Sequence, residues 1–180
     1  MKIKMTRELI EKLPKTDLHV HLDGSVRLQT IIDLANEGGI KLPTTDVEEL
    51  RKLIVCGDHT VSLDDYLRGF DIVNLVLQNK EGLRRAAYEL AEDAARENVR
   101  YMEVRYSPIL HTHGGLKLTD ISQAVIDGLK KAERDFGIQT GVIICGIRNM
   151  DPTTSLKLAE LAIAFKNKGV IAFDLAGGEY

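Results

Sequence analysis

Polar and apolar residues alternate through residues 17–24, near the start of the chain. The odd positions are polar and the even positions apolar: Asp17, His19, His21 and Asp23 against Leu18, Val20 and Leu22. Successive side chains of a β-strand point to opposite faces, so the pattern predicts a strand with one ionisable and one apolar face. Ser25 follows Gly24 and is positioned to cap a helix that packs back on this strand.

Three more strands are predicted, each preceded by helical segments. They are residues 99–107, 141–147 and 170–176, and the second of these is a continuous apolar run of the kind that helices cover in a parallel sheet. Apolar residues at helical spacing predict helices over about 6–13, 26–37, 47–54, 63–77, 83–94, 120–136 and 152–165. Strands separated by helices in this way predict an α/β fold with a parallel sheet.

Four predicted strands are too few for a complete (β/α)₈ barrel. A (β/α)₈ barrel usually takes about 250 residues, whereas this chain has 180. We therefore predict the first half, strands 1–4, of a (β/α)₈ TIM-type barrel, with residues 1–180 as the N-terminal half of a single barrel domain. No glycine-rich dinucleotide or phosphate-loop motif follows any strand, which disfavours the usual nucleotide-phosphate folds.

Composition and charge narrow the class of protein. The chain is 44% hydrophobic and 28% charged, as is usual for a soluble globular protein. A net charge of −3 without a basic cluster argues against a nucleic-acid partner. The sequence has no signal-peptide pattern and no apolar run of roughly 20 residues, so we expect a cytoplasmic protein without a membrane partner.

The two cysteines, Cys56 and Cys145, are not spaced as a Cys-x-x-Cys pair. Neither a disulfide framework nor a thiolate zinc site is indicated, and we interpret both residues as buried free thiols. The missing cysteine pair also excludes the zinc site of the cytidine-type deaminases.

The ionisable face of the first strand is a candidate metal site. Two histidines at positions 19 and 21 of a strand lie roughly 6 to 7 Å apart at their Cα atoms, so that both rings can converge on one ion. A catalytic zinc needs at least three protein ligands, so the pair is incomplete by itself. A solvated strand face stays open as the structural interpretation.

Other charged residues have less specific interpretations. A second His-x-His pair, His111 and His113, falls in a segment that we predict to be a loop and stays open as an alternative metal site. Glu103 and Arg105 share one face of the second predicted strand, where we interpret them as an ion pair inside the barrel.

Residues 13–25, Leu-Pro-Lys-Thr-Asp-Leu-His-Val-His-Leu-Asp-Gly-Ser, closely resemble the opening of the adenosine deaminases. Three further segments match that family in the same order: residues 67–71, residues 103–108 and residues 174–177. Adenosine deaminases are zinc enzymes of the amidohydrolase superfamily with a (β/α)₈ barrel. The resemblance covers essentially the whole chain and implies a Zn²⁺ cofactor, a purine nucleoside substrate (adenosine or 2′-deoxyadenosine, giving inosine and ammonia) and a role in purine salvage.

The resemblance also implies roles for single residues. His19 and His21 would be the first two zinc ligands, and His21 would also contact the substrate. Asp23 would bind the ribose 5′-hydroxyl, and Gly177 would bind the purine through its backbone. The hydrophobic lid over the substrate would comprise Tyr66, Leu67 and Phe70.

The chain also departs from the family pattern. The family usually has Phe where Tyr66 stands and Asp where Gly178 stands, which leaves the pocket polarity and the loop after the fourth strand open. The family's third zinc-binding His, its His-Ala-Gly-Glu segment with the proton-donating acid, its second catalytic His and its zinc-binding Asp are not among these 180 residues.

We therefore expect no general acid or base for catalysis in this chain, and no activity from it alone. Open strand edges would favour self-association. Two alternatives stay open: another metal-dependent amidohydrolase such as an adenine deaminase, and a non-catalytic half-barrel that serves as an assembly module.

Overall fold

A computed structural model describes residues 4–57 and 63–178, apart from the side chains of residues 63–66. One sheet contains four strands in the order β1 (Lys15–His21), β2 (Val99–Tyr106), β3 (Gln139–Ile147) and β4 (Val170–Ala176). Each strand pairs in parallel with the next one along the chain. The predicted α/β fold with four parallel strands is confirmed.

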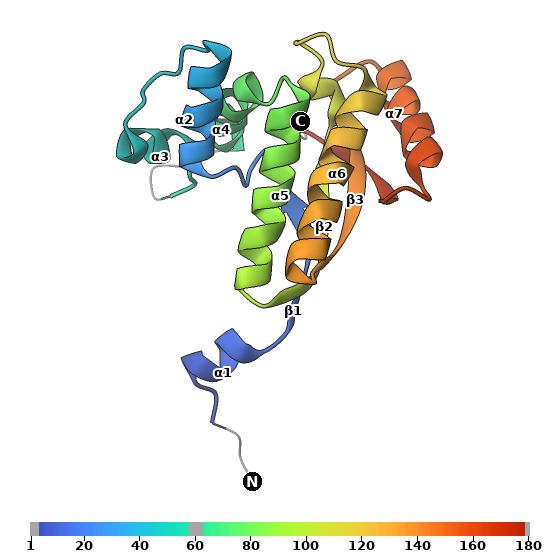
Figure 1. The fold of residues 1–180 in the computed structure, drawn as a ribbon. Helices are drawn as coiled ribbons and strands as arrows, with labels where there is room; N and C mark the ends of the chain where they lie inside the picture. Colours follow the sequence, from blue (N-terminus) through green and yellow to red (C-terminus); the bar gives the residue numbers. More distant parts are fainter. Residues whose placement is uncertain (1–3, 58–62, 179–180) are drawn as a thin grey trace.

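The helices lie in two groups around the sheet (Figure 1). The first group, α2 (Leu28–Gly38), α3 (Val47–Ile54) and α4 (Leu63–Val76), lies beyond the carboxyl end of β1. The second group, α5 (Lys80–Arg96), α6 (Leu118–Phe136) and α7 (Pro152–Phe165), packs along the strands, and the short α1 (Arg7–Lys12) projects away from the rest. In residues 4–57 and 63–178 no helix is both long and apolar enough to cross a membrane.

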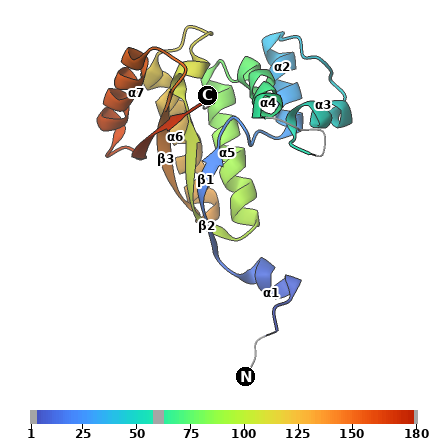
Figure 2. The ribbon, with the colours of Figure 1, turned by 180° about the vertical axis from the view of Figure 1, so that it is seen from behind.

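Helices α5 and α6 cover one face of the sheet, and Figure 2 shows the other face with no helix in front of the strands. On the covered face Met102 and Val104 of β2 are fully buried, as is Ile144 of β3. Gly128 lets α6 approach α5 closely, because a Cβ at this position would collide with the carbonyl oxygen of Arg84. The core therefore lies between the sheet and these helices, and the open face is left for polar groups.

Most predicted helix boundaries are close to those observed, but the start of α2 differs. Ser25 does not cap it; the N-cap residue is Arg27, and α2 begins at Leu28. The backbone N–H of Ser25 instead donates to the carbonyl oxygen of Leu22 at 3.3 Å. The chain thus makes a turn directly after β1, and the helix begins only when this turn is complete.

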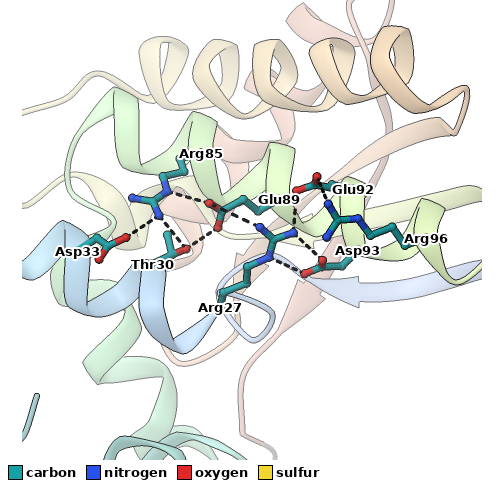
Figure 3. Close-up of polar contacts among 8 residues, drawn as sticks. All are labelled: Arg27, Thr30, Asp33, Arg85, Glu89, Glu92, Asp93 and Arg96. Carbon is teal, nitrogen blue, oxygen red and sulfur yellow. Dashed lines mark hydrogen bonds and ion pairs between the residues drawn. The ribbon is translucent and has the colours of Figure 1, made fainter. Parts of the chain in front are cut away.

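A network of ion pairs joins α2 to α5 (Figure 3). Nε of Arg85, on α5, lies 2.8 Å from Oε1 of Glu89, and its Nη2 lies 2.7 Å from Oδ2 of Asp33. The hydroxyl of Thr30 donates to Oε2 of Glu89 at 2.5 Å, and Arg27 binds acidic residues further along α5. The network fixes the helix group at the end of β1 against the helices that cover the sheet.

Candidate active site

A cavity of about 560 Å³ opens at the carboxyl ends of the strands. Six of the residues predicted from the sequence line it: His19, His21, Asp23, Leu67, Phe70 and Gly177. They come from β1 and its turn, from α4 and from the end of β4. The side chain of Tyr66 lies outside the described residues, so its predicted place in the lid stays a prediction.

The alternation in β1 places both histidines of this strand at the cavity. The ring centroids of His19 and His21 are 5.3 Å apart, and the ring of Phe70 lies edge-on to His21 at 5.8 Å. On the even positions Val20 packs against the hydrophobic core and Leu22 is fully buried. Leu18 shares their parity but is 56% exposed, because β1 is an edge strand.

Asp23 is a buried carboxyl group on the wall of the cavity, only 4% exposed. Burial raises its pKa to about 6. Hydrogen bonds from the backbone N–H groups of Asp23 and Gly24 act in the opposite direction, because they favour the ionised form. Its Oδ1 has no hydrogen-bond partner in the described part of the chain, and Nδ1 of His21 is 3.9 Å away. Asp23 thus presents an acceptor that a hydroxyl group of a ligand could satisfy.

Arg105 of β2 lies on the same open face, and its partners differ from the predicted one. Its Nη1 is 3.0 Å from Nδ1 of His19, and its Nη2 forms an ion pair with Asp174 of β4. Glu103 accepts a 2.8 Å hydrogen bond from the hydroxyl of Tyr101 instead. The predicted pair of Glu103 and Arg105 is therefore wrong, because the long arginine side chain reaches acceptors on both edge strands.

Asp174 was not identified as a partner of Arg105 from the sequence. Both residues fall within segments that resemble the family, residues 103–108 and 174–177, and this was the available signal. Their pairing depends on two strands that are not neighbours in the sheet, and no local pattern records that proximity.

The charges around His21 favour its neutral form. Burial lowers its pKa most, and the charges of Arg105 and His19 lower it further. A neutral imidazole is the form that binds a metal ion.

Two histidines on one wall of the cavity fit part of a zinc ligand set. Among the residues that the structure describes, no group of three or more His, Cys, Asp or Glu side chains could hold a metal ion. Zinc normally takes at least three protein ligands, so His19 and His21 would need ligands from outside the described residues.

The alternative metal site at His111 and His113 is not supported. Residues Pro108–His111 form a 3₁₀ helix, η1, where a loop was predicted. His111 is fully buried and its Nδ1 lies 3.1 Å from the carbonyl oxygen of Leu77, whereas His113 is exposed. A histidine held by the backbone in the core is a structural residue.

The two cysteines differ in exposure. Cys145 is buried, as predicted, and lines the cavity, and burial raises the pKa of its thiol. Cys56 is exposed, so its predicted burial is wrong. It comes just after the end of α3 at Ile54, where the chain leaves the helix for the surface.

Comparisons with known proteins agree with this architecture. The family model described as adenosine deaminase matches residues 14–180. An adenosine deaminase of Clostridium botulinum (strain 657 / Type Ba4) is 44% identical over 169 residues, which are 94% of this chain and 51% of that protein. The chain therefore spans about half the length of this relative.

Two solved structures have a similar fold. A cog1816 amidohydrolase from Burkholderia ambifaria with bound zinc has a TM-score of 0.82 and 27% identity, covering 98% of this chain and 48% of that one. An adenine deaminase from Arthrobacter aurescens has a TM-score of 0.80 and 29% identity, covering 92% of this chain and 49% of that one. In both, the match covers about half of the longer protein.

Proposed function

Because the chain belongs to the adenosine deaminase family, we propose that the protein hydrolyses adenosine, and 2′-deoxyadenosine, to inosine and ammonia in purine salvage, with residues 1–180 as the N-terminal half of one barrel domain. The observation that carries this proposal is the meeting of His19, His21, Asp23 and Gly177 around one cavity. These residues lie up to 158 positions apart in the sequence, from His19 to Gly177.

His19 and His21 would hold part of the zinc ion. Zinc bound at this position would supply a nucleophile from water at neutral pH. The wall formed by Leu67 and Phe70 would exclude water from the bound substrate, and the aromatic ring of Phe70 would also fix His21 by its edge contact. These are roles of binding and orientation, and proton transfer would fall to residues from the other half of the barrel.

Asp23 and Gly177 would orient the nucleoside. The buried Oδ1 of Asp23, without a partner in the described residues, can accept a hydrogen bond from a ribose hydroxyl. The backbone N–H of Gly177, which lines the cavity at the carboxyl end of β4, would contact the base, and a glycine allows close approach of a ligand to the backbone. Asp23 at the ribose and Gly177 at the base would together hold the nucleoside between the carboxyl ends of β1 and β4.

The test is a chimera in which residues 1–180 are followed by the second half of the C. botulinum relative. We expect zinc-dependent loss of adenosine absorbance as inosine forms, and loss of nearly all turnover in His19→Ala. His113→Ala, an exposed histidine away from the cavity, is the matched control and should leave turnover unchanged. The chain alone should be inactive, because catalytic groups that act as a unit lose nearly all their effect when some are missing.

Two outcomes would contradict the proposal. Zinc-dependent turnover by a pure monomer of residues 1–180 would overturn the division of the site between two halves. A folded, zinc-loaded chimera without activity on adenosine would overturn the assigned reaction.

A second candidate is deamination of the free base adenine. The similarity of the fold to the adenine deaminase from Arthrobacter aurescens favours it. The same chimera assayed with adenine separates the two, because a requirement for the ribose would appear as a preference for adenosine that Asp23→Ala weakens. The cytoplasmic location predicted from the sequence stays a prediction.

A further inference from the structure

Arg105 links the two edge strands across the open face of the sheet. Its Nη1 lies 3.0 Å from Nδ1 of His19 on β1, and its Nη2 is paired with Asp174 on β4. The residue is 8% exposed, and its Nε is buried without a hydrogen-bond partner among the described residues. These two acceptors hold the guanidinium group in place, and it also contacts the side chain of Cys145.

The chemistry of the two groups determines which nitrogen of His19 carries the proton. A guanidinium group has five N–H donors, no acceptor, and stays protonated in proteins. Its contact with Nδ1 of His19 is a hydrogen bond only if Nδ1 has a free lone pair. The neutral ring must then carry its proton on Nε2.

We propose that Arg105 is a positioning residue that fixes His19 as the Nε2–H tautomer and competes with a metal ion for this histidine, while Asp174 is the acceptor that receives the guanidinium group when it leaves. The part of this inference that concerns metal rests on the proposed function, which takes His19 as a ligand. The part that concerns the tautomer does not.

The competition follows from the number of lone pairs on the ring. Histidines that bind a metal usually donate a hydrogen bond from their other nitrogen to a carboxylate or a carbonyl group. His19 cannot donate from Nδ1 while Arg105 donates to it. A metal ion can bind only after the guanidinium group leaves, either at Nδ1 itself or at Nε2 once the ring proton has moved from Nε2 to Nδ1.

Asp174 makes this movement possible without leaving a charge unpaired. The guanidinium group already contacts this carboxylate, so it can release His19 and keep an ion pair. If it instead lost Asp174, its remaining partners would be His19 and the weakly accepting sulfur of Cys145. The carboxylate therefore favours the state in which His19 is free for metal.

The tautomer is tested first, in the metal-free chain, by long-range ¹H–¹⁵N correlation spectra of the histidine rings. We expect His19 as the Nε2–H tautomer in the wild type and in Arg105→Lys, which keeps a cationic donor. Arg105→Met should shift the ring toward the tautomer mixture of a freely exchanging histidine. Arg100→Met, an exposed arginine on the same strand, is the control and should change nothing.

The competition is tested by calorimetric titration with zinc alone. Arg105→Met should bind zinc roughly tenfold more tightly than the wild type, because a charged hydrogen bond no longer competes for His19. Asp174→Asn should weaken binding, and its effect should shrink in the double variant that also lacks Arg105. Circular dichroism confirms that each variant is folded. If the methionine variant does not fold, Arg105→Leu, which also lacks a donor, replaces it.

The outcomes separate this inference from the proposed function. An Nδ1–H tautomer for wild-type His19, or unchanged zinc affinity in a folded Arg105→Met variant, overturns the inference. Zinc binding that His19→Ala does not reduce in any variant overturns the metal assignment of the proposed function, while the tautomer result decides the role of Arg105 separately.

Discussion

Arg27 and Asp93 form a two-point ion pair between the start of α2 and the end of α5. Nη2 of Arg27 lies 2.6 Å from Oδ1 of Asp93, and its Nε lies 2.9 Å from Oδ2 (Figure 3). The same Nη2 is 2.7 Å from Oε2 of Glu92. The hydrogen bond with Asp93 is the main reason that the pKa of Arg27 is raised. This pair anchors the turn that carries Asp23 to the helices that cover the sheet.

Removing Arg27 should therefore destabilise the chain. We expect Arg27→Gln to lower the free energy of unfolding by about 1–2 kcal/mol, since a bidentate pair between partly buried groups is lost. Arg96→Gln is the matched control. Arg96 is exposed and, among the described residues, it contacts this network through Glu92 alone, so its loss should cost about 0.5 kcal/mol or less. Urea denaturation measures both, and equal effects would show that the two-point geometry contributes nothing.

Buried His111 should make stability depend on pH. Burial lowers its pKa to about 4, and the charge of His113 adds to this, whereas the hydrogen bond with Leu77 opposes it. The unfolded chain, with a histidine pKa of 6.5, binds the proton first as the pH falls. The stabilisation is therefore complete above about pH 6.5 and is lost progressively toward pH 4, by an amount on the order of 3 kcal/mol.

The difference between the wild type and His111→Gln isolates this effect from other titrating groups. The unfolding free energy of the wild type minus that of the variant should grow as the pH rises from about 4 to 6.5. His113→Gln changes an exposed ring, so the corresponding difference should stay flat. A flat difference for His111→Gln as well would mean that this residue is not held neutral by burial.

Gly177 should not tolerate a side chain. Its φ is +105°, and a Cβ would lie 3.2 Å from Oδ1 of Asn149. We expect Gly177→Ala to cost about 1–2 kcal/mol of stability, because L-residues rarely adopt this backbone conformation. Gly178→Ala is the control, since, its chain neighbours aside, no atom of the described residues lies within 4 Å of a Cβ there. Similar unfolding free energies for the two variants would contradict the role of the backbone conformation.

The two edge strands should make the isolated chain associate with itself. Leu18 on β1 is 56% exposed and Leu175 on β4 is 46% exposed, and neither strand has a partner on its outer side in the described sheet. Lysine at either position should raise the monomer fraction in sedimentation velocity, because a charge on an open edge opposes strand pairing. Ile163→Lys on the outer face of α7 is the control and should have little effect. An entirely monomeric wild type would contradict this prediction.

The periodicity of the sequence was sufficient to predict the regular elements of the fold. The alternation over residues 17–23 predicted β1 and the shared face of His19 and His21, because side-chain direction in a strand follows from position alone. Residues 47–54 were predicted as a helix and form one with the same bounds, since Asp46 caps it through the backbone N–H groups of Glu48 and Glu49.

Local patterns failed where a distant contact determined the conformation. Ser25 has the chemistry of a helix cap, yet α2 begins after Arg27, whose side chain is held by acidic residues of α5. His111 was predicted to lie in a loop, because Pro108 and two glycines flank it, but the carbonyl group of Leu77 holds it in the core. Neither partner is near in the sequence.

For the candidate site, too, some features follow from the sequence and others from distant contacts. The sequence by itself determined the residue types and, by resemblance to a family, which of them to expect at one site: His19, His21, Asp23 and Gly177. Only the tertiary structure decided that Arg105 donates to His19 and pairs with Asp174 rather than with Glu103, because strands that are far apart in sequence bring these groups together across the open face of the sheet. The strand period determines the face on which a side chain lies, whereas its partner depends on which strands the fold places within reach.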